Sequence, residues 1–144
     1  MGKKRIVKKG NSSVDTGSKD RSISRLSKKR LESGVLHVQS TYNNTKLVLT
    51  DQKGGVICNS SSGSLGFKGS KKSTPFAAAK AGEVMAEKAD VLGLKTVDVI
   101  VNGVGMGRES AIRAFTNRGV GINSIQDKTP IPHNGVTKRR TRRV

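Results

Sequence analysis

Hydrophobic and β-branched residues first gather in short runs separated by turn residues, which is the pattern of β-strands. Two runs, residues 35–42 and 45–50, flank the Asn43-Asn44 pair, which favours a turn. A third run at residues 56–58 follows a glycine-containing turn at 51–55. These runs predict a meander of three antiparallel strands.

The spacing of apolar residues then changes to three or four, the period of a helix. Thr74 can cap a first turn, and Pro75 suits the first helical position. Gly93 is a typical residue just beyond a helix end. The apolar positions between them are Ala78, Ala81, Met85, Ala89 and Leu92. A helix over about residues 75–92 is therefore predicted.

Two more strands and one more helix are predicted beyond this point. Residues 97–101 are nearly all apolar, which indicates a strand buried on both faces of a sheet. A glycine-rich loop leads into a helix over about 109–118, and residues 121–126 have the pattern of a last strand. The order βββαβαβ predicts a single α/β domain, with a mixed five-stranded sheet, right-handed crossovers and helices packed on it.

Basic residues outnumber acidic ones by 28 to 10, a formal net charge of +18, which points to a polyanionic partner. We divide the chain into a basic N-terminal extension (1–33), an α/β core that binds RNA (34–128), and a proline-containing strap with a basic tail (129–144). Both ends lack apolar periodicity, so we expect them to be disordered until a partner orders them. The basic residues of the tail are Lys138, Arg139, Arg140, Arg142 and Arg143.

Several function classes find no support in the sequence. A membrane partner would call for a long apolar span or a basic amphipathic helix with bulky apolar residues, and neither is present. Cys58 is the only cysteine, which excludes an intrachain disulfide, and His37 and His133 do not complete a zinc site. No Gly-x-Ser-x-Gly motif or acidic pair indicates catalysis. We therefore expect no enzyme activity, no cofactor and no metal.

The segment Gly103-Val104-Gly105-Met106-Gly107-Arg108 lies between a predicted strand and a predicted helix. Backbone N–H groups in this position can hold a phosphate. Three interpretations stay open: a dinucleotide site with Asp127 on the ribose, a structural turn, and a contact with an RNA phosphate. The spacing GxGxG in place of GxGxxG disfavours the dinucleotide, and Arg108 favours a backbone phosphate.

The loop at residues 60–74 is rich in Ser, Gly and Lys and leads into the first predicted helix. It does not fit a Walker A motif, because lysine stands where glycine is needed. Its lysines suit a phosphate backbone, while Phe67 either stacks on a base or fills the core, the second being favoured. Asn43 and Asn44 either contact bases and riboses or only form a turn by tolerating positive φ.

Residues 129–135 cannot extend the sheet, because each proline removes a hydrogen-bond donor and fixes φ. An extended strap that leads to the basic tail is therefore predicted. Asn134-Gly135 forms a turn within it. Because glycine gives little steric cover, the following amide nitrogen can attack Asn134 and form a succinimide.

Six segments of the chain, in this order and spacing, resemble small-subunit ribosomal protein eleven. They are Gly34-Val35-Leu36-His37-Val38-Gln39, Tyr42-Asn43-Asn44-Thr45, Gly66-Phe67-Lys68-Gly69, Lys72-Ser73-Thr74-Pro75-Phe76-Ala77-Ala78, Gly105-Met106-Gly107-Arg108-Glu109-Ser110 and Thr129-Pro130-Ile131-Pro132-His133-Asn134-Gly135. The fourth and the last of them together are highly specific. The resemblance covers roughly residues 34 to 144.

The resemblance implies a ribonuclease-H-like fold without the nuclease's acidic metal site, and a structural role in the small ribosomal subunit. It implies binding to small-subunit rRNA on the platform, near the mRNA exit path and ribosomal proteins seven, eighteen and twenty-one, rather than a free homo-oligomer. It also implies isoaspartate at Asn134. The matching residues that would face rRNA are Asn43, Asn44, Lys68, Lys71, Lys72, Ser73, Thr74, Arg108, His133 and Asn134.

Two positions depart from the family pattern. Val104 stands where the family usually has proline, which removes rigidity from the glycine loop. The tail after Gly135 lacks the usual Cys-Arg-Pro-Pro and keeps only its charge. The implied location is a ribosome in an organelle of bacterial descent or in a bacterial cytoplasm, and this drift favours the organelle.

Overall fold

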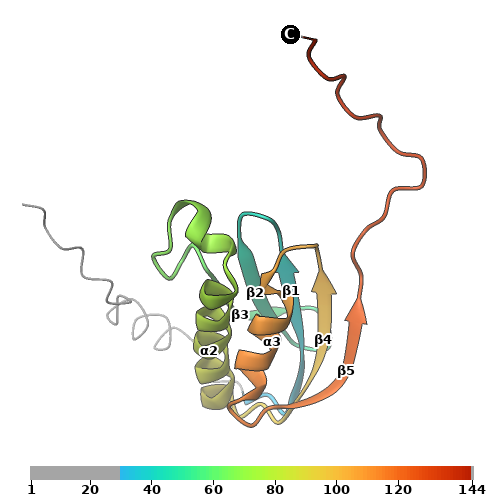
Figure 1. Cartoon of the computed structure of the whole chain (residues 1–144). Helices are drawn as coiled ribbons and strands as arrows, with labels where there is room; N and C mark the ends of the chain where they lie inside the picture. Colours follow the sequence, from blue (N-terminus) through green and yellow to red (C-terminus); the bar gives the residue numbers. More distant parts are fainter. Residues whose placement is uncertain (1–29, 144) are drawn as a thin grey trace, which may run out of the picture.

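The structure, a computed structural model, describes residues 30–143 and contains one α/β unit (Figure 1). The predicted N-terminal extension lies outside the described residues except for its last four. The predicted α/β fold with a mixed five-stranded sheet is confirmed. The elements are β1 (Ser33–Ser40), β2 (Thr45–Thr50), β3 (Val56–Ser61), the short 3-10 helix η1 (Gly69–Ser73), α2 (Pro75–Leu92), β4 (Thr96–Asn102), α3 (Gly107–Thr116) and β5 (Gly121–Asp127).

The strands lie in the order β3-β2-β1-β4-β5. β2 is antiparallel to β1 and β3, while β4 is parallel to β1 and β5. The two crossovers, from β3 to β4 and from β4 to β5, move across the sheet in the same direction. Right-handed crossovers in one direction place both helices on one face, and Figure 1 shows α2 and α3 side by side there.

This one-sided cover corrects the prediction that residues 97–101 are buried on both faces. Val97, Val99 and Val101 are buried beneath the helices, whereas Asp98 and Ile100 on the other face are only half-buried. The apolar run at 97–101 therefore predicted more burial of β4 than the structure shows, because Ile100 lies on the sheet face that no helix of the described residues covers. The helix-covered face instead carries the core, whose largest buried side chains include Phe115, Leu36, Leu47, Leu49 and Met85.

The ends of α2 follow the predicted local signals. The Thr74 hydroxyl accepts a hydrogen bond from the Ala77 N–H at 3.3 Å, and Pro75 is the first helical residue. Gly93 ends the helix in the left-handed conformation, with φ at 73°. α3 starts at Gly107, two residues earlier than predicted, and β3 continues to Ser61 instead of ending at residue 58.

The two helices approach closely at a small residue of α2. A Cβ atom on Gly82 would lie 2.5 Å from the Ala111 carbonyl oxygen and 3.1 Å from the Ala114 Cβ. Glycine therefore permits the backbones of α2 and α3 to meet, which holds α3 against the sheet. Because α3 is held at Ala111 and Ala114, the position of its first turn and of the loop before it is also set.

Candidate nucleic-acid interface

Four connecting segments gather at one end of the sheet, which we call the loop end: residues 41–44, 62–74, 103–106 and 128–134. They meet there because β1, β3, β4 and β5 run in one direction, so that each of these strands ends at the same edge. Figure 1 shows these segments together at the top of the molecule, where the C-terminal tail also leaves. The fold therefore brings together predicted site residues that lie far apart in the sequence.

Two exposed lysines of the loop end, Lys68 and Lys71, have no ion-pair partner in the described part of the chain, although this end also contains the ion pair between Arg108 and Asp127. The aliphatic part of the Lys72 side chain lies over Gly63, because a Cβ atom added to Gly63 would be 3.6 Å from the Lys72 Cδ. At the opposite end, ion pairs join Lys95 to Glu32 and Arg118 to Glu87.

Hydroxyl groups of the 62–74 segment hold its own backbone in shape. The Ser73 hydroxyl donates to the Ser70 carbonyl oxygen at 2.9 Å, and the Thr74 hydroxyl donates to the Lys71 carbonyl oxygen at 2.8 Å. These two predicted site residues therefore serve first to build the turn that carries the lysines. The ammonium groups of the lysines are the donors that this turn presents to solvent.

Phe67 does not fill the core, so the favoured interpretation of this residue is wrong. Leu65 takes the inward position of the segment and packs against the core, while Phe67 is half-buried at the surface. Its ring meets the Phe76 ring edge to face, with centroids 6.1 Å apart and planes at 86°. Phe76 is itself 64% exposed, and the Lys80 ammonium lies 5.8 Å from its ring centroid.

Thr41 builds the turn between β1 and β2. Its hydroxyl oxygen accepts hydrogen bonds from the N–H groups of Asn43 at 3.4 Å and Asn44 at 3.1 Å. Neither asparagine has a positive φ, so tolerance of that conformation does not explain the pair. Tyr42 at the tip is 75% exposed, and Asn43 is also exposed. Tyr42 and Asn43 are thus presented outward, whereas Oδ1 of Asn44 is buried and has no hydrogen-bond partner among the described residues.

The glycines of the 103–107 loop are required by close packing. A Cβ atom on Gly103 or Gly105 would collide with the backbone oxygen of Ser40 or Thr41, and one on Gly107 would collide with the Thr45 hydroxyl. The loop therefore lies directly on the ends of β1 and β2, which supports the structural-turn interpretation of these glycines.

Arg108 is engaged by groups of this chain. Its Nη1 donates to the Gly103 carbonyl oxygen at 3.0 Å, and its Nη2 pairs with the Asp127 carboxylate. Asp127, a residue that the dinucleotide interpretation would place on a ribose, also accepts two hydrogen bonds from Thr129. These hydrogen bonds lower the pKa of Asp127 to about 2, those from Thr129 having the larger effect and that from Arg108 the smaller. Sequence reasoning missed this pairing, because the partners lie on different elements.

The C-terminal strap is exposed throughout residues 130–143, and no hydrogen bond joins this part to the described body. Asn134 has a φ of 52° and is the non-glycine residue with positive φ in the described range. The turn predicted at Asn134-Gly135 is consistent with this conformation. His133 and the five basic residues of the tail lie in the same exposed segment.

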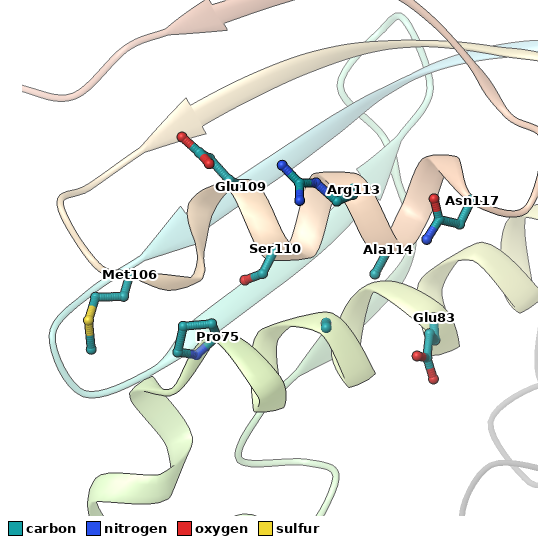
Figure 2. A pocket seen from close by; sticks show the side chains of 9 residues that line it. Pro75, Glu83, Met106, Glu109, Ser110, Arg113, Ala114 and Asn117 are labelled. Atoms are coloured by element: carbon teal, nitrogen blue, oxygen red, sulfur yellow. The ribbon is translucent and has the colours of Figure 1, made fainter.

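Two shallow grooves flank α3. One of about 430 Å³ lies between α2 and α3, where Figure 2 shows Ser110 and Ala114 of α3 directed toward α2, while the Glu83 side chain points away from α3. The other, of about 720 Å³, lies between α3 and β5. In residues 30–143 no group of three or more His, Cys, Asp and Glu residues is placed to hold a metal ion. Within the same range, no helix has the length and apolar character to span a membrane.

The thiol of Cys58 is buried in the core, which makes it a poor nucleophile. Burial raises the pKa of the Cys58 thiol to about 11, although the nearby Lys88 charge opposes this rise. Its sulfur lies 3.4 Å from the Met85 sulfur within the core. Lys88 is also buried, and its ammonium donates to the Asn59 carbonyl oxygen at 2.8 Å. These groups belong to the core and not to the loop end.

Comparison with protein families gives one match. The family model for ribosomal protein S11 matches residues 34–143. The match therefore includes the sheet apart from Ser33, both helices, all four segments of the loop end and the basic tail.

Proposed function

The chain belongs to the ribosomal protein S11 family, and we propose that its loop end and its C-terminal tail bind small-subunit rRNA. This family is a structural, non-enzymatic class of ribosomal protein, and membership in it implies a structural protein of the small ribosomal subunit. What carries the proposal for the loop end is one observation: the exposed Lys68 and Lys71, the exposed Tyr42-Asn43 tip and the departure of the basic tail occur together at this end of the sheet.

The proposed contacts divide into two kinds. Lys68, Lys71 and Lys72 and the basic tail would neutralise phosphates, because ammonium and guanidinium groups are the donors that bind them. Outward polar groups at the hairpin and strap would contact riboses or base edges. The proposed rRNA-facing residues in full are Asn43, Asn44, Lys68, Lys71, Lys72, Ser73, Thr74, Arg108, His133, Asn134, Lys138, Arg139, Arg140, Arg142 and Arg143.

The finer placement follows from the family resemblance. We place the protein on the platform of the small subunit, near the mRNA exit path and close to ribosomal proteins seven, eighteen and twenty-one. We place that ribosome in an organelle of bacterial descent or in a bacterial cytoplasm. We further propose that Asn134 converts to isoaspartate, because a glycine follows it in an exposed turn with a φ of 52°.

Charge reversal at the two ends of the sheet tests the proposal. Lys68→Glu with Lys71→Glu should weaken binding to small-subunit rRNA and lower the slope of log affinity against log salt by about 1.4 to 1.8. The matched control is Lys53→Glu with Lys95→Glu, which makes the same change of charge with exposed residues at the opposite end. Equal loss of affinity in both pairs would show that only net charge matters, and would refute a defined interface at the loop end.

A further inference from the structure

Arg108, Asp127, Thr129 and Gly103 form a closed ring of hydrogen bonds at the loop end. Arg108 donates to the Gly103 carbonyl oxygen and to the Asp127 carboxylate. Asp127 Oδ1 accepts from the Thr129 hydroxyl at 2.6 Å and from the Thr129 N–H at 2.9 Å. The Thr129 hydroxyl oxygen in turn accepts from the Gly103 N–H at 3.1 Å. Each of the four residues is therefore joined to two others of the ring.

The ring joins three segments of the chain at the point where the tail leaves the body. Gly103 begins the loop after β4, Arg108 lies in the first turn of α3, and Asp127 is the last residue of β5. The Lys128 N–H also donates to the Val101 carbonyl oxygen at 2.8 Å, which continues the attachment by one residue. Beyond Thr129 no further hydrogen bond holds the described strap to the body.

The strap is restrained where it leaves Thr129. Pro130 follows directly and Pro132 comes two residues later, and proline fixes its own φ while it restricts the residue before it to extended conformations. The first residues of the strap are therefore stiff. A change of backbone direction at Thr129 would redirect residues 130–132, and with them the start of the path that leads to the basic residues from Lys138.

Arg108 is poorly suited to act mainly as a phosphate ligand. Two of its guanidinium nitrogens are bonded within the chain, and its charge is compensated by Asp127. We infer that Arg108 and Asp127 are positioning residues, which hold the strap so that the C-terminal tail leaves the loop end in the direction of the rRNA. This inference rests on the proposed function of the tail, and it assigns to Arg108 an indirect role in that function.

The sign of one substitution separates the two roles of Arg108. Asp127→Asn removes a negative charge and releases Arg108, so a direct phosphate contact predicts tighter binding of small-subunit rRNA. A positioning role predicts weaker binding, by about threefold to tenfold. Asp90→Asn is the matched control, since it removes one exposed carboxylate at the opposite end of the sheet. We expect this control to bind as tightly as the unaltered chain or slightly more tightly.

Arg108→Lys provides the second variant, because lysine keeps the positive charge but cannot bridge Gly103 and Asp127 with a planar fork. We expect a loss of affinity like that of Asp127→Asn. The decisive comparison repeats Asp127→Asn in a chain that ends at residue 137, where the loss should disappear because the tail is absent. Thermal unfolding of each variant reports whether the body stays folded.

Each outcome has one meaning. Tighter binding by Asp127→Asn in the full chain would overturn the inference in favour of direct contact, and unchanged binding would overturn it because the ring would then have no effect on the tail. An equal loss in the full and shortened chains would also overturn it, because the effect would then act through the body. If the unaltered full chain does not bind small-subunit rRNA above a competing duplex DNA, the proposed function itself fails.

Discussion

Removal of residues 138–144 should weaken rRNA binding without unfolding the protein. This segment carries Lys138, Arg139, Arg140, Arg142 and Arg143 and no acidic residue. The described part of it is exposed and has no hydrogen bond to the body. Because nothing in the core depends on the segment, we expect the free energy of unfolding to change by less than about 0.5 kcal/mol.

The size of the binding effect follows from the number of exposed charges. Each phosphate that is neutralised contributes roughly 0.7 to 0.9 to the slope of log affinity against log salt. If all five basic residues reach phosphates, the slope falls by about 3.5 to 4.5 on deletion. Over a fourfold range of salt, this contribution corresponds to about two to three orders of magnitude in affinity.

The assay is filter binding or fluorescence anisotropy with a small-subunit rRNA fragment over a series of potassium chloride concentrations. A second variant, in which all five basic residues become glutamine, keeps the length of the tail and separates charge from chain length. Both variants should lose the same part of the slope. A slope that stays unchanged in the two variants would refute the role of the tail.

Three further predictions test other parts of the structure. Gly107→Ala should lower the free energy of unfolding by about 1–3 kcal/mol in urea titrations, because its Cβ would meet Thr45 and Ala78; the control Gly63→Ala, whose Cβ has 3.6 Å of clearance, should be close to neutral. Burial raises the pKa of Cys58 to about 11, so iodoacetamide should alkylate this thiol far more slowly in the native protein than in guanidinium. Equal alkylation rates in the two conditions would contradict its burial. The unfolded thiol ionises near pH 9 and the buried one near pH 11, so the free energy of unfolding should fall as the pH rises from 9 through 11. Aged protein should yield isoaspartate at Asn134 in peptide mapping, and Gly135→Ala should suppress it; unmodified Asn134 throughout would remove that proposal.

Signals that are local in the sequence predicted the elements well. Thr74, Pro75 and Gly93 each act within one helical turn, and α2 begins and ends where they indicate. The burial of β4 was predicted less well, because it depends on which face the crossovers place the helices. That property arises from the order of all five strands and not from the residues of β4.

The candidate site shows the same division. The lysines of the 62–74 segment and the charge of the tail were visible in the sequence, since a cluster of basic residues can be recognised without knowing which other elements it contacts. The pairing of Arg108 with Asp127 was not, because it joins α3 to the end of β5 across 19 positions. The place of Phe67 also depended on tertiary structure, since Leu65 takes the inward position first.

Crosslinking in the intact small subunit tests the central claim most directly. The subunits would be purified from the cells that make this protein, irradiated with ultraviolet light, and digested for mass spectrometry of peptides joined to RNA. We predict that crosslinked peptides contain Lys68 to Thr74, the Tyr42-Asn43-Asn44 tip or the tail from Lys138, with small-subunit rRNA as the partner. Crosslinks confined to the opposite end, around Lys53 and Lys95, would contradict the interface proposed at the loop end.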